Sequence, residues 1–321
     1  MIQHLNKSEA GDLVERCVVL ASLLEVSGYP KPGNVHRTSD TGKTRYEHFL
    51  AGSVSIGPAF RRLAENAFRA GLGEIEMGDI GLGSSILEAS KDALSWQKGG
   101  NVNLGIILLL APLSAASGFC LSRGMPENLE KLRTNLGAVI RACGTEDSVA
   151  IYQAIRSAVP LKVLGKAEKL DVLDTGSIKA IRKENQTPLS IFSSCKDRDS
   201  ICSEWTSDFS ITFGLGYPTL REAFQTTGDI NISIVHTFLR LLSMIPDSLI
   251  VRKSGHNAAL EVSSMAASVL EKGGMSNPEG KMKIREMDDK LRKSKGALNP
   301  GTTADITAAS LYLLLFEGWR P

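Results

Sequence analysis

The sequence predicts an all-α fold: a single compact multi-helix domain over residues 1–321, with an apolar helix at its centre. Apolar residues recur at helical spacing through most of the chain, and no stretch keeps the two-residue alternation of a strand. Hydrophobic residues make up 42% of the 321, which is enough to bury a sizeable core. No repeat, low-complexity tract or long linker marks a domain boundary.

The first predicted helix follows the expected cap Ser8 and ends near Gly28. Its apolar stripe consists of Leu13, Val14, Cys17, Val18, Ala21 and Leu24. Pro126 suits the first turn of a later helix. Thr145 is expected to cap the next one, with two acidic residues in the first turn, where the helix dipole favours negative charge. The helices expected in this half, after the first, span 46–70, 84–96, 102–121, 126–143 and 145–159.

The second half continues the helical pattern. Residues 159–173 are the least regular stretch and are interpreted as a connection, with a short strand as the alternative. Asp199 and Glu204 are five residues apart on a predicted helix and do not share a face cleanly, so neither is expected in a site. The helices expected here span 189–209, 229–244, 256–271, 278–293 and 303–316.

Residues 104–121, LGIILLLAPLSAASGFCL, approach the roughly 20 apolar residues that cross a bilayer. Pro112 interrupts this run, and Ser114, Ser117 and Gly118 dilute it. No second span follows. A helix that is apolar on all sides is also typical of the core of a large helical protein. We therefore predict a central buried helix and no membrane span.

The charge of the chain is nearly balanced. A formal net charge of +2, from 37 basic and 35 acidic residues, gives no electrostatic case for nucleic acid or an anionic membrane as partner. An anionic small molecule would have to be held by local chemistry. The oligomeric state is left open, and a homo-oligomer is compatible with the sequence.

The cysteines and the N-terminus predict a cytoplasmic protein. The five cysteines are scattered, without a CxxC pair or a zinc-ligand cluster, and we interpret them as reduced core residues. The opening sequence, MIQHLNKSEAGDLVERC, has neither an apolar signal core nor a small-residue cleavage site.

The loops between helices hold the residues suited to chemistry. In segment 25–37, EVSGYPKPGNVHR, two prolines stiffen the backbone and Gly33 permits a close approach or a positive φ. The segment places Glu25, Lys31, His36 and Arg37 on one stiff turn, a combination that suits a phosphate. The alternative is a helix terminator followed by solvated charges.

A second segment, 99–105 or GGNVNLG, precedes the apolar helix. Free backbone amides at a helix N-terminus bind anions, and glycines let a ligand come close. Asn101 and Asn103 are therefore candidate binding residues. The alternative, that they only cap the helix, is the commoner role of asparagine at this position.

The third segment, 246–256, contains Asp247 after a proline and Arg252 in a basic cluster. The alternatives for these two are a turn cap and an exposed basic face. The fourth, 298–306 or LNPGTTADI, opens the last helix with a tight turn, and one of its two threonines is expected to cap. Asp305 either complements the helix dipole or faces a ligand.

Taken together and in order, these segments resemble the triphosphoribosyl-dephospho-CoA synthase family, the ATP:dephospho-CoA triphosphoribosyltransferases. Segment 25–37 is similar to the family signature EVSxxPKPGLVDR, and 299–305 is similar to NPGxxAD. These two matches are specific. Looser ones are 99–105 with GxNTHKG, Asp247 to Arg252 with a D…R stretch, and Ser53 and Pro58-Ala59-Phe60 with S…P.F.

The resemblance implies an all-α cytosolic transferase that joins the triphosphoribosyl part of ATP to dephospho-CoA and releases adenine. ATP would be a substrate, Mg²⁺ a cofactor, and the product the precursor of the prosthetic group of citrate- or malonate-lyase-type carrier proteins. The partners would be small-molecule nucleotides. The catalytic carboxylates would be Glu25, Asp247 and Asp305, the last two also metal ligands. Phosphate and nucleotide contacts would come from Lys31, Gly33, His36, Arg37, Asn101, Asn103, Arg252, Asn299 and Gly301.

Two departures from the family pattern fall inside the motifs. His36 stands where the signature has Asp, and Asn103-Leu104 stand where the family has His-Lys, which removes a cation. They favour a divergent branch with a different acceptor or donor. Two alternatives follow: phosphoryl transfer or hydrolysis on another phosphorylated nucleotide or metabolite in the same pocket, and a non-catalytic binding or assembly protein.

Overall fold

The computed structural model describes residues 5–124, 128–158 and 176–321. The regular structure in these ranges is helical, with no strand and only two isolated bridges, both in the loop after the first helix. The predicted all-α class is confirmed. The α-helices are α1 (Lys7–Ser27), α2 (Tyr46–Ser55), α3 (Gly57–Gly71), α4 (Leu82–Ser95), α5 (Leu104–Ser122), α6 (Leu129–Ala142), α7 (Thr145–Ala158), α8 (Ser177–Lys183), α9 (Pro188–Ser193), α10 (Ser200–Thr206), α11 (Tyr217–Thr227), α12 (Ile230–Met244), α13 (Ser248–Ser254), α14 (His256–Glu271), α15 (Pro278–Arg292) and α16 (Gly301–Phe316).

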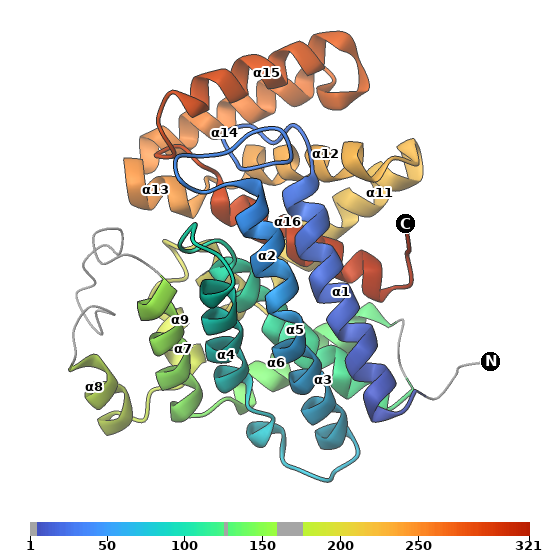
Figure 1. Ribbon diagram of the computed structural model, residues 1–321, viewed down its shortest axis with the longest axis vertical. Helices are drawn as coiled ribbons and strands as arrows, with labels where there is room; N and C mark the ends of the chain where they lie inside the picture. Colours follow the sequence, from blue (N-terminus) through green and yellow to red (C-terminus); the bar gives the residue numbers. More distant parts are fainter. Residues whose placement is uncertain (1–4, 125–127, 159–175) are drawn as a thin grey trace.

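Helix α5 is the central helix that the sequence predicts. It is long and apolar enough to cross a membrane by length and composition, but 94% of its apolar window is buried inside the protein. Helices α1, α3, α4, α6 and α16 pack around it (Figure 1). Contacts with other helices therefore bury the apolar surface of α5 on all sides.

Two large hydrophobic clusters organise the interior of the described chain, and a third, small one joins α7 and α8. The larger of the two joins α1, α3, α4, α5, α6 and α16 with parts of their neighbours, and the smaller one joins α12 to α15, at the top of Figure 1. In α16, Ala304 belongs to the smaller cluster and Ile306 to the larger one. The first turn of α16 therefore lies where the two clusters meet.

Two predicted helices are broken in the structure. The helix expected over 46–70 is divided at Ile56 into α2 and α3, because Pro58 in the first turn of α3 has no N–H to continue the ladder. The helix expected over 189–209 is wrong as one element. Its middle is a turn, and the Asp199 carboxylate starts α10 by accepting the N–H groups of Ile201 and Cys202.

The cysteine interpretation is wrong for one pair. Cys195 and Cys202 form a disulfide across the turn between α9 and α10, with Cα atoms 5.8 Å apart. Cys17, Cys120 and Cys143 are free and buried, as expected. A separation of seven residues matches no metal or redox motif, so the pattern of cysteines did not indicate the bridge.

Several expected helix starts are also different. Asn6, not Ser8, caps α1 in a capping box with Glu9, and Asn128 caps α6. The threonines of the last segment lie inside α16, which begins at Gly301. Pro126 and the irregular stretch 159–173 fall outside the described residues. Helices α8, α11 and α13 were not predicted.

Candidate active site

The four segments singled out in the sequence converge at the start of α16. The Asn34 amide donates to Asn299 Oδ1 at 3.0 Å, which joins the first segment to the last. The Asp247 carboxylate accepts the backbone N–H of Thr303 at 2.7 Å, which joins the third. A Cβ on Gly105 would lie 1.9 Å from Asp305 Oδ2, so the second segment packs directly against that carboxylate.

Glu25 and Lys31 form a buried ion pair at the end of α1. Lys31 Nζ donates to Glu25 Oε1, and the two side chains are 0% and 2% exposed. The ammonium also lies 5.9 Å from the centre of the Phe238 ring. Burial lowers the pKa of Lys31 and raises that of Glu25, while their mutual attraction opposes both changes. Lys31 thus faces a carboxylate and not the solvent.

Asp305 lies in the second turn of α16, and its side chain is partly exposed. Within the described ranges it has no hydrogen-bond or ion-pair partner. Burial raises its pKa well above the usual value, and the nearby charges of Glu25, Asp247 and Asp199 raise it further, against the opposing charge of Arg252. A carboxyl with a raised pKa holds its proton more readily than an exposed Asp and is a candidate for general acid or base catalysis.

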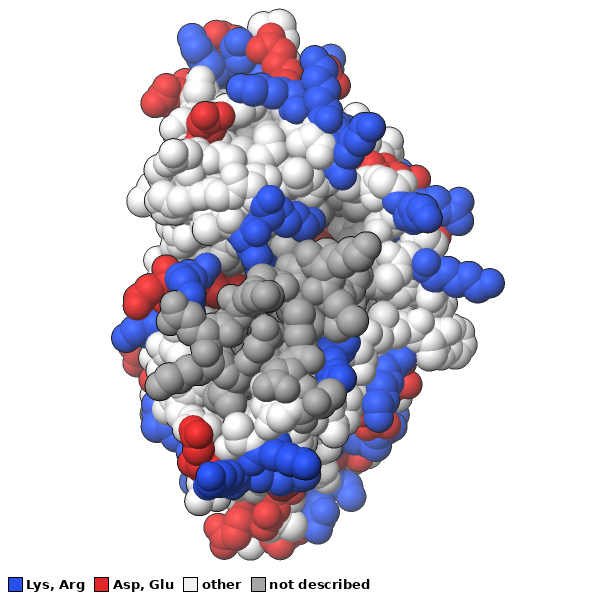
Figure 2. Space-filling view, turned by 90° about the vertical axis from the view of Figure 1, so that its left-hand side faces the viewer, with Lys and Arg blue, Asp and Glu red and all other residues white. Residues whose placement is uncertain are grey.

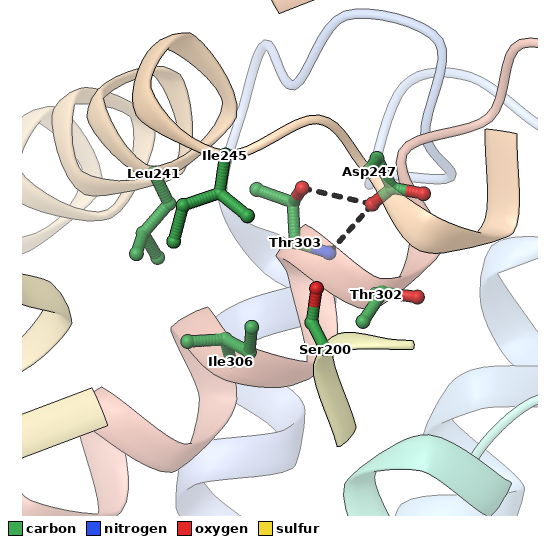
Figure 3. Close-up of a pocket in the computed structure, with 7 residues that line it drawn as sticks. All are labelled: Ser200, Leu241, Ile245, Asp247, Thr302, Thr303 and Ile306. Carbon is green, nitrogen blue, oxygen red and sulfur yellow. Dashed lines mark hydrogen bonds between the residues drawn. The ribbon is translucent and has the colours of Figure 1, made fainter. Parts of the chain in front are cut away.

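Asp247 is buried, and both oxygens of its carboxylate accept hydrogen bonds (Figure 3). One oxygen caps α13 by accepting the N–H groups of Leu249 and Ile250, and the other accepts both the N–H and the hydroxyl of Thr303. Burial raises the pKa of Asp247, and these hydrogen bonds oppose the rise. Figure 3 shows the carboxylate at a small pocket lined also by Ser200, Leu241, Ile245, Thr302, Thr303 and Ile306.

The first segment is pinned from both sides by helices of the smaller cluster. Gly33 has a φ of +75°, which favours glycine, and its N–H donates to Asp288 at 2.8 Å. On the other side, the Asn231 side chain bonds both the N–H and the carbonyl of Tyr29. These contacts hold the prolines and Lys31 against α12 and α15.

His36 is one of the residues that hold segment 25–37 against α15. It is 2% exposed, and its Nε2 lies 3.0 Å from an Arg292 nitrogen, while its Nδ1 lies 3.2 Å from the Thr38 hydroxyl. Burial is the main reason that its pKa is lowered. Arg292 also donates to the carbonyls of Asn34 and Asp40. The histidine at this position of the signature therefore ties the loop to α15.

Two cations of the predicted set are accessible. Arg37 is exposed, donates to Asn231 at 3.3 Å and lies over the Tyr29 ring. Arg252, 40% exposed, lies 3.5 Å from Asp199. On the face in Figure 2, Lys and Arg are interspersed with Asp and Glu, in agreement with the balanced net charge.

The second segment is held by its asparagines. Asn101 accepts the N–H of Leu104, the first residue of α5, at 3.2 Å, while the N-cap position is taken by Asn103, whose side chain makes no capping hydrogen bond. Asn103 is 1% exposed and donates to the Ser53 hydroxyl at 3.0 Å, and its own oxygen has no partner among the described residues. In the last segment, the Gly301 N–H donates to the Asn299 carbonyl.

The described residues contain no group of three or more His, Cys, Asp or Glu side chains that could hold a metal ion by themselves. Mg²⁺ does not need such a group, since it often binds one or two carboxylates together with substrate phosphates. Asp305 has no hydrogen-bond or ion-pair partner in the part of the chain that the structure describes, so its carboxylate is of the kind that fits that mode. Asp247 would have to share oxygens that already accept four hydrogen bonds.

Sequence reasoning missed the residues that position the site. Asp199 was set aside because the turn before α10 was taken as helix, yet it pairs with Arg252. Asn231, Asp288 and Arg292 hold the first segment from more than 190 residues away in sequence. Nothing in one sequence indicates such contacts.

Comparisons with known proteins agree over nearly the whole chain. The model of the ATP:dephospho-CoA triphosphoribosyl transferase family matches residues 12–321. A 2-(5″-triphosphoribosyl)-3′-dephosphocoenzyme-A synthase of Klebsiella pneumoniae is 24% identical over 317 residues, which cover 98% of this chain and 93% of that protein. The corresponding protein of Streptococcus equi subsp. equi is 25% identical over 308 residues, 95% of this chain and 97% of its own length.

The fold has a counterpart among solved structures. A crystal structure of an Archaeoglobus fulgidus protein, described as a triphosphoribosyl-dephospho-CoA synthase, has a TM-score of 0.61 and 24% sequence identity. The match covers 84% of this chain and 100% of the other. It supports the helical fold independently of the sequence motifs.

Proposed function

We propose, on the premise that the chain belongs to the ATP:dephospho-CoA triphosphoribosyl transferase family, that this transferase works at the start of α16 and releases adenine. The observation that carries the proposal is Asp305. It is a carboxyl with a raised pKa and with no hydrogen-bond or ion-pair partner among the described residues, and it lies where the four segments meet.

The reaction replaces one bond at C1′ of the ATP ribose with another. The bond from C1′ to adenine breaks, a bond from C1′ to a ribose hydroxyl oxygen of dephospho-CoA forms, and the hydroxyl proton leaves. Adenine departs with the bonding electron pair and takes up a proton. Such displacements pass through an oxocarbenium-like centre, as in glycoside transfer. They need a group that moves a proton and carboxylates near the developing positive charge.

We assign the proton transfer to Asp305. Its raised pKa means that the carboxyl holds a proton more readily than an exposed Asp, a shift that is typical of groups that act as general acid or base. The Glu25–Lys31 pair contributes to the electrostatics of this carboxyl. The charge of Glu25 raises the pKa of Asp305, and the charge of Asp305 raises the pKa of Lys31. Asp247 fixes the first turn of α16 through Thr303.

The triphosphate would meet Arg37 and Arg252, the two accessible cations of the predicted set. Guanidinium groups suit phosphate because they offer planar pairs of N–H donors. Mg²⁺ would be held by the triphosphate itself, because we assign Asp305 to the proton transfer and the Asp247 carboxylate already accepts four hydrogen bonds; when bound, it supplies positive charge that neutralises the phosphates. Asn101, Asn103, Asn299 and Gly301 would shape the backbone around the nucleotide.

Adenine release tests the proposal. The purified protein is incubated with ATP, Mg²⁺ and dephospho-CoA, and adenine and the coupled product are measured by liquid chromatography with mass spectrometry. We expect both to accumulate in equal amounts. Asp305→Asn should lower the rate by at least about 100-fold, which is a typical contribution of a proton-transfer group.

Asp289→Asn is the matched control, since Asp289 is exposed on α15, and it should retain full activity. A folded protein that forms neither product overturns the proposal. Release of phosphate or pyrophosphate without adenine would support the alternative of phosphoryl transfer or hydrolysis in the same pocket.

A further inference from the structure

The turn between α9 and α10 leads to the candidate site at Ser200. Its two ends are joined by the disulfide of Cys195 and Cys202, and Cys195 is partly exposed. The turn contains Asp199 and leads into Ser200, which lines the pocket at Asp247. None of the four sequence motifs includes this turn.

The Asp199 carboxylate connects the turn to the predicted phosphate contact. Its Oδ1 accepts the N–H groups of Ile201 at 2.9 Å and Cys202 at 3.4 Å, and so caps α10. Its Oδ2 lies 3.5 Å from an Arg252 nitrogen on α13. One carboxylate therefore links the disulfide-bonded turn of α10 to the Arg252 side chain.

A second contact fixes the same turn to the helix that carries Asp305. The Ser200 N–H donates to the Ser248 hydroxyl at 3.3 Å, and that hydroxyl donates to Thr302 in the first turn of α16 at 3.0 Å. The charges of both Asp199 and Arg252 act on the Asp305 carboxyl. The pair thus lies within electrostatic range of the candidate reacting group.

We propose that Asp199 is a positioning residue that holds Arg252 toward the phosphates of the donor nucleotide, and that the Cys195–Cys202 disulfide keeps Asp199 in place. The inference rests on the proposed function. Arg252 is 40% exposed, and a long side chain at such a position samples many rotamers unless a partner restrains it. A negative partner that is itself fixed by a covalent ring restrains the guanidinium before the ligand arrives.

The arrangement makes substrate binding sensitive to thiols. A dithiol reductant would transfer two electrons and two protons to the disulfide, giving two cysteine thiols and the oxidised, cyclic form of the reductant. The turn then keeps its cap but loses its covalent closure. In the described chain the other three cysteines are free and buried, so the Cys195–Cys202 disulfide is the group with which a reductant reacts.

The test compares Asp199→Asn with wild type in the adenine-release assay. Asn caps helices as well as Asp does, so α10 keeps its start while Arg252 loses its charged partner. We expect the KM for ATP to rise roughly tenfold with kcat changed little, the result for lost ground-state binding. Asp197→Asn, an exposed neighbour in the same turn, is the matched control and should leave KM unchanged.

Reduction supplies the second arm. Wild type treated with dithiothreitol should show a raised KM for ATP, and Cys195→Ser/Cys202→Ser should show that KM with or without the reductant. Thiol titration after denaturation identifies the state, since three of the five cysteines are free when the bridge is formed.

The outcomes separate the two proposals. The role of Asp199 is overturned if the wild type is active and Asp199→Asn has the same KM for ATP. It is also overturned if Asp199→Asn and Asp197→Asn lose kcat equally. Five titratable thiols in protein purified without reductant overturn the role of the disulfide. Wild type that neither releases adenine nor binds ATP in calorimetry overturns the proposed function, and this inference with it.

Discussion

At the scale of single residues, the buried ion pair of Glu25 and Lys31 is the feature of the site whose stability depends most directly on both partners being present. Two charged groups with 0% and 2% exposure are tolerated only because each neutralises the other. The pair joins the end of α1 to the loop that follows it. It therefore couples the stability of the fold to the electrostatics around Asp305.

Removing one partner of this pair tests that coupling. Lys31→Met leaves the Glu25 carboxyl buried without a countercharge, and we expect unfolding free energy to fall by about 3–5 kcal/mol. The measurement is urea denaturation followed by circular dichroism. Glu25→Gln/Lys31→Met is the control and should recover part of the loss. A single variant within about 1 kcal/mol of wild type would contradict the structure of the pair.

His36 stands where the family signature has Asp, and its contacts in the fold bear on how this departure is interpreted. An imidazole in place of a carboxylate suggested a changed ligand site. In the fold it packs against Tyr29 and bonds Arg292 and Thr38. Its contacts hold a loop, so the substitution does not by itself argue for a different reaction.

At the scale of elements, the close approach of α5 and α16 shapes the site. Gly105 in the first turn of α5 lies against Asp305, and any side chain there would meet its carboxylate. The absence of a Cβ is what lets the N-terminus of the central helix come this near to the charged group. The dipole of α5 then favours the ionised form of that carboxylate.

Gly105→Ala therefore tests the geometry of the reacting group. A methyl group 1.9 Å from Asp305 Oδ2 must displace the carboxylate, and we expect kcat to fall by about 100-fold. Circular dichroism should show a folded protein. Gly144→Ala, where an added Cβ meets nothing within 4 Å, is the control and should keep full activity. Undiminished activity of Gly105→Ala would exclude Asp305 in its present position as the group that moves the proton.

At the scale of the whole molecule, stability depends on pH through its buried acids. Burial raises the pKa of Glu25, Asp247, Asp305 and Glu204, the last to about 7. A folded state with raised carboxyl pKa values binds more protons than the unfolded state. Its extra stability is present below the unfolded pKa and is lost as pH rises through the folded pKa.

Glu204 permits a quantitative test. It is fully buried in the larger cluster, where it accepts the N–H groups of Ile211 and Thr212. Its pKa of about 7, against an ordinary value of 4.5, predicts that about 3 kcal/mol of unfolding free energy is lost between pH 4.5 and pH 8. Urea denaturation at several pH values measures this loss. Glu204→Gln should lack that part of the slope, and parallel curves for the two proteins would refute the assignment.

The sequence by itself determined the helical class, the central apolar helix and the four chemical segments. Each of these is encoded locally: the helix repeat in periodic apolar positions, and the segments in runs of proline, glycine and charge. The helix boundaries that the apolar pattern missed also have local causes, because Pro58 and Asp199 each interrupt a helix that the pattern continues.

The tertiary structure alone decided how those segments meet. The Asp247–Thr303 contact joins residues 56 apart, and the Gly33–Asp288 contact joins residues 255 apart. Such pairs depend on how whole helices pack, which is set by the summed burial of two clusters and not by any local pattern. For the same reason the roles of Asp199, His36 and the Cys195–Cys202 bridge became visible only when α9, α10, α13 and α15 were in place around the first turn of α16.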